Sequence, residues 1–310
     1  MRKHPYDMSR IKATAGILKS SVRLFLQNDP LRMSGATAFF TMFALPPILI
    51  ILVQVFGLFI DPKTFRHELF ISLADTFGQE AVRQLGAVIK AVRQLSFNLL
   101  ATVLGFVFLL FVDTTVFKVV RSSISQIWGV EDGERKKVLA TLQQRLQSLV
   151  LILVTGLLFS VGILIETVQV VIGNYFIRIF PSLSSLFNLV LAFTISTLIV
   201  AIWFLLIFRY LTDVRPKWNI AWGGALFTSI LFSIGKIVLH WLLTYNNITN
   251  FYGASASIVL LLLFVFYAAM IMYFGAAFTK ILAQHKQQDF GSALSQLQLN
   301  AEQLHTVEQQ

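Results

Sequence analysis

Six apolar segments constrain the fold of this chain more than any other feature, because each is near or above the length of a membrane span. A transmembrane helix needs about 20 predominantly apolar residues to cross the roughly 30 Å hydrocarbon core of a bilayer. Only 13% of the 310 residues are charged, against about 25% in a typical soluble domain. We therefore predict an all-α, polytopic integral membrane protein with six transmembrane helices. The predicted spans are Ser34–Ile60, Phe97–Val120, Ser148–Ile172, Ser184–Phe208, Ile220–Leu243 and Ser257–Leu282.

The distribution of Lys and Arg predicts which side of the membrane each connection faces. The segments on the side of the N-terminus hold seven, five, three and one of these residues, 16 in all, whereas the opposite connections hold six. Cytoplasmic loops carry the excess of positive charge, so both termini are predicted to be cytoplasmic. The five cations between Lys63 and Arg93 oppose this rule, because their segment falls on the outer side.

Three regions follow from the pattern of polar and apolar residues: a basic segment 1–33, a membrane domain 34–283 and a polar, Gln-rich tail 284–310. The membrane domain includes an outer insertion, 61–96, in which apolar residues at helical spacing predict two amphipathic helices. The tail is predicted to be solvated.

The basic N-terminal segment is predicted to form an amphipathic helix. Whether this helix lies on the membrane surface or packs under the bundle stays open. Asn28-Asp29-Pro30 is predicted to end it and to cap the next helix. The apolar residues of the predicted helix recur at spacings of four and three: Ile11, Ala15, Leu18, Val22 and Phe25.

Ionisable groups inside predicted spans are candidate functional residues, because burying charge in a bilayer is costly. Counted from the cytoplasmic ends of their spans, Glu166 lies at about 27 Å and Lys236 at about 24 Å, at 1.5 Å per residue. We predict that they form an ion pair or line one outward-facing polar cavity. His240 lies one turn beyond Lys236 on the same face and is assigned to the same cavity. The alternative, that each side chain snorkels independently to the interface, stays open.

A second polar cluster is predicted near the cytoplasmic side of the membrane. Asp113 lies at that depth, and its candidate partners are Lys118, Arg121 and Arg209. We interpret this cluster as a structural staple rather than as part of a transport path, since buried polar groups are usually paired. Lys118 and Lys280 lie near the inner boundary and are expected to snorkel.

Two further sequence features concern the packing of the spans. Pro46-Pro47 lies near the middle of the first span, where two missing backbone donors predict a kink or a break. Small residues permit close helix contacts at Gly223-Gly224-Ala225 with Thr228, at Gly156 with Ser160 and at Gly275 with Thr279.

Signatures of enzymes and of bound cofactors are missing from the sequence. The chain has no Cys, which excludes disulfides, thiolate metal sites and Cys nucleophiles. Its five His residues include no pair at i, i+4 spacing, and it has neither a Walker-type phosphate loop nor a Gly-x-Ser-x-Gly elbow. We therefore predict no catalytic residues, no metal and no cofactor.

The order of several short motifs resembles the YihY/BrkB family of bacterial inner-membrane proteins, over about residues 29–283. One departure is Ala277, which stands where the family commonly has Glu after its last Gly-Ala. The motifs are Asp29-Pro30-Leu31-Arg32-Met33-Ser34-Gly35-Ala36-Thr37-Ala38-Phe39-Phe40 leading to Pro46-Pro47, Ile127-Trp128-Gly129-Val130, Phe208-Arg209-Tyr210, Gly224-Ala225-Leu226-Phe227, Tyr252-Gly253-Ala254 and Gly275-Ala276.

The resemblance implies a six-helix protein of the bacterial plasma (inner) membrane, with links to virulence in some relatives. The ribonuclease BN label once given to the family is interpreted as a misassignment, because this chain lacks a soluble catalytic domain and a metal-ligand cluster. We expect a protein that handles or transports a lipid or an amphipathic solute, with anionic headgroups as partners on the cytoplasmic face. A non-transporting scaffold for envelope integrity is the alternative, and ribonuclease activity is the least favoured. The sequence is compatible with a homo-oligomer and indicates no nucleic-acid partner.

Overall fold

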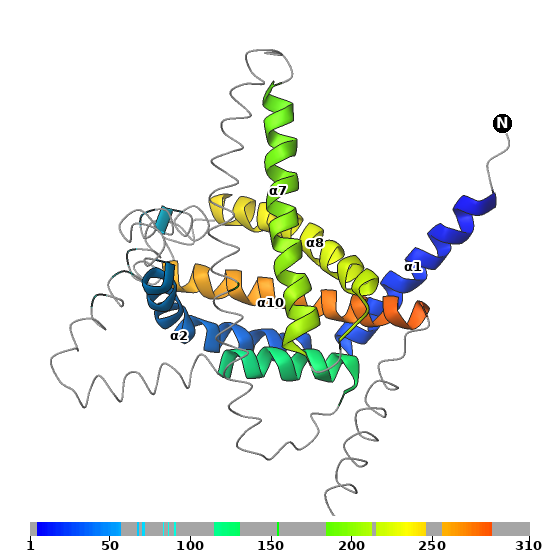
Figure 1. The fold of residues 1–310 in the computed structure, drawn as a ribbon, viewed down its shortest axis with the longest axis horizontal. Helices are drawn as coiled ribbons and strands as arrows, with labels where there is room; N and C mark the ends of the chain where they lie inside the picture. Colours follow the sequence, from blue (N-terminus) through cyan, green and yellow to red (C-terminus); the bar gives the residue numbers. More distant parts are fainter. Residues whose placement is uncertain are drawn as a thin grey trace, which may run out of the picture.

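The structure is a computed structural model that describes about half of the chain (Figure 1). Every element in the described residues is helical, as the sequence predicted. The outer insertion 61–96, the span predicted at 148–172 and nearly all of the tail lie outside the described residues, apart from isolated positions. The described residues are 5–56, 67, 70–71, 83, 86, 90, 115–130, 154, 184–212, 215–245 and 256–286.

Six helical elements and one π-helical turn make up the described part of the chain. Three of the helices are long and apolar enough to cross a membrane, over Phe193–Leu211, Trp218–Val238 and Ile258–His285. They match the last three predicted spans. The elements are α1 (Pro5–Leu26), α2 (Pro30–Phe56), the helix 115–128, α7 (Ser184–Leu206), the π-helical turn η2 (Ile207–Leu211), α8 (Trp218–Tyr245) and α10 (Ala256–His285).

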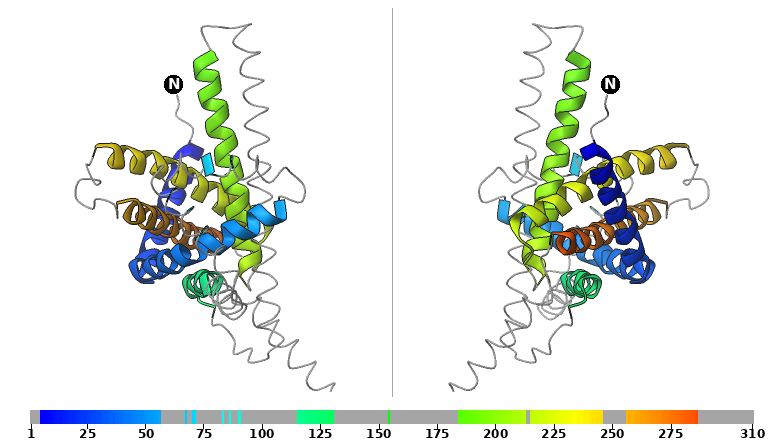
Figure 2. Two further views of the ribbon diagram at one scale, coloured as in Figure 1. Left: turned by 90° about the vertical axis from the view of Figure 1, so that its left-hand side faces the viewer. Right: turned by 90° about the vertical axis from the view of Figure 1, so that its right-hand side faces the viewer.

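Helices α8 and α10 run side by side in opposite directions and interlock through small residues (Figures 1 and 2). A Cβ added at Gly224 would lie 1.9 Å from Thr279 Oγ1, and one added at Gly275 would lie 1.9 Å from Thr228 Oγ1. Each threonine donates its hydroxyl proton to the carbonyl of the glycine one turn earlier in its own helix, at 2.6 and 2.7 Å. The sequence prediction of close packing at these residues is confirmed.

The outward and inward faces of α8 differ in a way that suits lipid as the surrounding solvent. Its buried face carries Ala221, Gly224, Ala225, Thr228 and Ser229, all small or hydroxyl-bearing. In a bilayer, helices associate through close backbone approach at small residues, because lipid tails are as apolar as Leu. The exposed face carries the larger aliphatic residues Leu226, Ile230, Ile234, Ile237 and Val238.

Helix α10 is the element on which three others pack. Tyr273 of α10 forms a hydrogen bond with Thr37 of α2, with 2.5 Å between the two oxygens. Phe274 meets Phe25 of α1 edge-on, with ring centroids 5.4 Å apart. The indole Nε1 of Trp128, at the end of helix 115–128, donates to the carbonyl of Ala276 at 3.0 Å. This helix continues eight residues beyond the end predicted for the second span at Val120.

Helix α7 packs on α8 but crosses it steeply, as both further views show (Figure 2). Thr197 and Ser233 join the two helices through their hydroxyls at 3.1 Å, and Phe204 meets Phe232 edge-on. Transmembrane helices tilt by about 20° on average from the bilayer normal. The α7 axis and the α8–α10 pair therefore cannot both lie along that normal, and one of them is strongly tilted.

Helix α2 is continuous through Pro46 and Pro47, so of the two predicted outcomes the break does not occur. Figure 1 shows its axis changing direction along its length, so the kink is compatible with the structure and the break is not. A proline removes one donor and disturbs one preceding turn, and neighbouring groups in a bundle can compensate for both.

Helix α1 confirms the predicted helix, and part of its apolar stripe is exposed. Ser21 is fully buried and Phe25 packs against the core, whereas Leu18 and Val22 are exposed. The helix ends as predicted: Asn28 Nδ2 donates to the Leu24 carbonyl at 2.8 Å. Asp29 has a φ of 51°, in the left-handed region that Asp tolerates better than most residues, and Pro30 begins α2.

The interlock predicts that Gly224→Ala destabilises the protein by about 1–3 kcal/mol, because the new methyl group overpacks the contact with α10. Gly35→Ala in α2 is the matched control, since a Cβ there would meet nothing within 4 Å. That change is expected to be neutral or stabilising by up to about 1 kcal/mol. Thermal unfolding of the detergent-solubilised protein measures both variants, and equal stability of the two would contradict the interlock.

Candidate functional site

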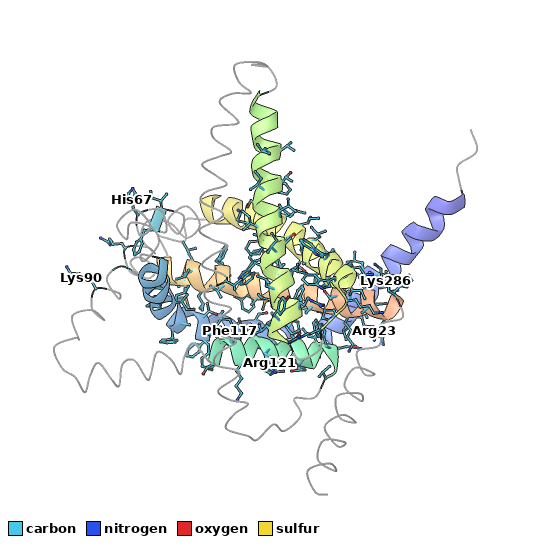
Figure 3. All side chains as sticks on the ribbon, in the orientation of Figure 1. Arg23, His67, Lys90, Phe117, Arg121 and Lys286 are labelled. Carbon is cyan, nitrogen blue, oxygen red and sulfur yellow. The ribbon has the colours of Figure 1, made fainter. Side chains whose placement is uncertain are left out.

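Six helix ends meet at one end of the bundle, which we call the basic end. It comprises the C-terminal turn of α1, the first turn of α2, residues 125–130, the α7–α8 connection and the last turns of α10. Arg32 of α2 donates to Gln126 Oε1 at 3.2 Å, and a Cβ on Gly223 of α8 would contact Leu282 of α10. Figure 3 shows Arg23 and Lys286 at this same end.

The name of the basic end reflects its side chains. Among the side chains that the structure describes at this end, Asp29 is the carboxylate. Its Oδ2 lies 4.0 Å from Arg32 Nε, on an exposed surface. An exposed pair of this kind contributes little to stability. Among the described side chains at this end, positive charges therefore outnumber negative ones. The described cations at this end are Arg23, Arg32, Arg209, Arg215, Lys217, Lys280 and Lys286.

The end of helix 115–128 is closed by a Schellman motif. Gly129 has a φ of +69°, which suits glycine, and its N–H donates to the Gln126 carbonyl at 3.0 Å. The N–H of Val130 donates to the Ser125 carbonyl at 2.9 Å. These bonds explain the Ile127-Trp128-Gly129-Val130 motif as a helix terminus whose glycine is required by the backbone.

Lys280 completes this terminus from another helix. Its Nζ donates to the Ile127 carbonyl at 3.0 Å, and a Cβ on Gly129 would lie 3.2 Å from the same nitrogen. A cation at a helix C-terminus also interacts favourably with the helix dipole. Lys280 is half-buried. The expectation that it snorkels is therefore wrong, because a carbonyl acceptor lies within reach inside the protein.

A chain of three buried hydroxyls joins α2, α10 and helix 115–128. Thr37 donates to the Met33 carbonyl at 2.9 Å, so its single proton is in use. Tyr273 must then donate its proton to Thr37 Oγ1, and Ser123, which also hydrogen-bonds Tyr273, must donate to the phenol oxygen. The order of donation therefore runs from Ser123 through Tyr273 and Thr37 to Met33.

Two buried polar side-chain atoms have no hydrogen-bond partner within the described part of the chain, Ser34 Oγ and Arg209 Nε. Ser34 is fully buried and lies one turn before Thr37 on α2. Leaving a buried donor unpaired costs about 1–3 kcal/mol, so these two atoms are polar groups that the described packing leaves unsatisfied.

Arg209 lies in η2, directly after the apolar α7. Its guanidinium carbon is 4.3 Å from the centroid of the Trp218 ring, and its NH1 group donates to the carbonyl of Pro216. Both contacts fold the side chain over the connection that leads into α8. Pro216 is fully buried beneath it, whereas Arg215 and Lys217 on either side are exposed.

The predicted inner cluster is described only in part. Asp113 lies outside the described residues. Lys118 is exposed and Arg121 is half-buried on helix 115–128, where Figure 3 labels Arg121. Arg209 has the contacts with Pro216 and Trp218 given above. The pairing of Asp113 with any of the three cations stays a prediction.

The predicted outer pair also stays a prediction. Glu166 and the side chain of His240 lie outside what the structure describes. Lys236 is exposed on α8, between Ile234 and Ile237 of its lipid-facing stripe. That exposed position is compatible with snorkelling, one of the two interpretations. Among the described residues, no group of three His, Cys, Asp or Glu side chains is placed to hold a metal ion.

Sequence reasoning missed the hydroxyl chain and the role of Lys280. Thr37 and Tyr273 are 236 residues apart, and hydroxyl residues are common in membrane helices, so no local spacing pointed to their contact. The sequence offered one usable signal. Trp128-Gly129 and Gly275-Ala276 both belong to the short motifs that resemble the YihY/BrkB family.

Comparison with known proteins identifies the family. The profile of the family described as "Virulence factor BrkB" matches residues 21–297, so the chain belongs to this family. It is 23% identical over 288 residues to a "UPF0761 membrane protein" of Saccharophagus degradans, covering 89% of this chain and 63% of that protein. It is 24% identical over 260 residues to a "UPF0761 membrane protein" of Mannheimia succiniciproducens, covering 83% and 86%. No solved structure matches the chain.

The terminus of helix 115–128 predicts that Lys280→Met destabilises the protein by about 1–3 kcal/mol, because the buried Ile127 carbonyl loses its donor. Lys286→Met removes an exposed lysine six residues later and is expected to change stability by less than about 0.5 kcal/mol. Chemical unfolding in detergent, followed by circular dichroism, measures both. Equal effects of the two substitutions would show that the hydrogen bond does not support the fold.

Proposed function

We propose that this BrkB-family protein handles or transports a lipid or an amphipathic solute across the bacterial plasma membrane, without enzymatic activity. The family and the apolar helices establish a membrane protein. The observation that supports the finer proposal is the distribution of polarity. On α8, the hydroxyls of Thr228, Ser229 and Ser233 are buried, whereas the large aliphatic residues from Leu226 to Val238 are exposed on the opposite face.

An amphipathic molecule needs polar groups for its head and apolar surface for its chains. Thr197 and Ser233 provide buried hydroxyls between α7 and α8, and Ser34 provides a buried hydroxyl with no partner among the described residues. The adjacent exposed stripe of α8 provides aliphatic surface. Polar groups inside a membrane are costly and are therefore functional candidates.

The proposal includes a topology in which the basic end faces the cytoplasm, with both termini on that side and six spans. Contacts between the helices support this topology. The helix ends that these contacts bring together are the ones that the distribution of Lys and Arg assigns to the same side of the membrane. Anionic headgroups of the inner leaflet are the proposed partners of this end. Because 16 of the 25 Lys and Arg residues serve orientation in this topology, they do not argue for nucleic-acid binding or for ribonuclease activity.

A non-transporting scaffold for envelope integrity is the second candidate. It is favoured by the hydroxyls of Thr37, Thr228 and Thr279, each of which donates to a carbonyl of its own helix. Hydroxyls satisfied in this way can serve packing alone. The scaffold and the transporter differ in whether the purified protein moves a lipid between leaflets.

Transport is tested with proteoliposomes that carry a fluorescent phospholipid, whose outward movement is followed by chemical quenching from outside. We expect faster movement than in protein-free vesicles. Thr197→Val is expected to slow it about fivefold, as for the loss of one buried hydrogen bond of about 1 kcal/mol. Thr194→Val is the matched control, because Thr194 lies on the exposed side of the same helix. Movement no faster than in protein-free vesicles would contradict lipid transport and favour the scaffold.

A further inference from the structure

We propose that the α7–α8 connection binds the phosphate of an anionic phospholipid headgroup. Arg209, Arg215 and Lys217 supply the positive charge, and Tyr210 and Trp218 supply the flanking aromatic rings. This proposal rests on the proposed function for its membrane setting. It deepens that function by assigning the lipid contact to five residues of one connection.

The position of the connection between two spans places it at headgroup depth. One membrane-spanning stretch ends at Leu211 and the next begins at Trp218. The short segment between them must therefore lie at the membrane surface. Tyr210 is 47% exposed and Trp218 is 50% exposed. Exposed Tyr and Trp at the ends of spans are typical of the interfacial layer where lipid phosphates lie.

Arg209 is held in place before any ligand binds. The π-helical turn η2 carries it, the Trp218 ring lies against its guanidinium, and the Pro216 carbonyl accepts one of its protons. A guanidinium has five N–H donors, so these contacts leave others for phosphate oxygens. Its planar fork also matches the geometry of phosphate. Arg209 Nε is buried and has no partner among the described residues, so the side chain is not fully satisfied by the protein.

Arg215 and Lys217 add two cations at the surface of the connection. Exposure alternates along this stretch, with Arg215 and Lys217 exposed on either side of the buried Pro216. The connection contains one acid, Asp213, outside the described residues, so three cations outweigh it in charge.

The same chemistry would attract free phosphate, but the surroundings favour a lipid. The exposed aliphatic stripe of α8 begins at Leu226, about 12 Å along the helix from Trp218 at 1.5 Å per residue. It continues through Ile230 and Ile234. A phospholipid with its phosphate at the connection can lay its acyl chains along this stripe, which free phosphate cannot do.

Lipid binding to the full-length protein in a neutral detergent, counted by native mass spectrometry, tests the site. The probes are phosphatidylglycerol, phosphatidylcholine and inorganic phosphate, each titrated alone. The double variant Arg215→Gln/Lys217→Gln is compared with Lys19→Gln/Lys90→Gln, which removes the same charge from two exposed lysines that are not among the cations of the basic end. Both variants retain Arg209 and its packing contacts.

We expect the wild-type protein to prefer phosphatidylglycerol, with affinity falling about 25-fold in Arg215→Gln/Lys217→Gln, or about fivefold for each cation. The control variant should change by less than about twofold, and binding of phosphatidylcholine should change in neither. Equal loss in the two variants, or none, would overturn the site. Binding of inorganic phosphate as tight as that of phosphatidylglycerol would overturn its assignment to lipid. Because this measurement does not involve movement between leaflets, it can succeed where the transport assay fails.

Discussion

The close approach of α8 and α10 is the contact on which the rest of the described bundle depends. In a bilayer, burial of apolar surface does not draw helices together, because acyl chains solvate leucine as well as a protein interior does. Association then requires short distances and satisfied polar groups. Gly224 and Gly275 provide the short distances, since neither site has room for a Cβ. The threonines that fill the space satisfy their own hydroxyls within their helices. With α8 fixed in this way, α10 presents Tyr273, Phe274 and Ala276 to three other helices.

Polar contacts then order the basic end. Lys280 and Trp128 connect α10 with the terminus of helix 115–128, and Arg32 connects that terminus with α2. A lysine in this position interacts with a helix terminus instead of reaching for water. The remaining cations, among them Arg215 and Lys217, stay exposed around this joined set of helix ends. One end of the bundle therefore combines hydrogen bonds between helices with exposed cations, which suits a protein that meets anionic headgroups.

The sequence was sufficient for features that depend on composition and local spacing. The apolar spans matching α7, α8 and α10, the turn at Asn28-Asp29-Pro30 and the glycines that contact Thr228 and Thr279 were all predicted. Features that depend on distant partners were not. The sequence predicted a kink or a break at Pro46-Pro47 without choosing between them, and the continuity of α2 excludes the break. Nothing in the local spacing of α1 indicated that Ser21 is its fully buried residue. The ion pair of Glu166 with Lys236 would also join residues far apart in sequence, and it stays a prediction.

The central claim is that the helix ends gathered at the basic end share one membrane surface, the cytoplasmic one. Because the chain has no Cys, single cysteines placed at exposed Lys19, Gln126 and Lys286 report their location without background. A fourth, at Tyr245 at the other end of α8, reports the opposite surface. With a membrane-impermeant maleimide applied to spheroplasts, the account predicts labelling at position 245 alone, and labelling at the other three after permeabilisation. Labelling of position 19, 126 or 286 in sealed spheroplasts would contradict it.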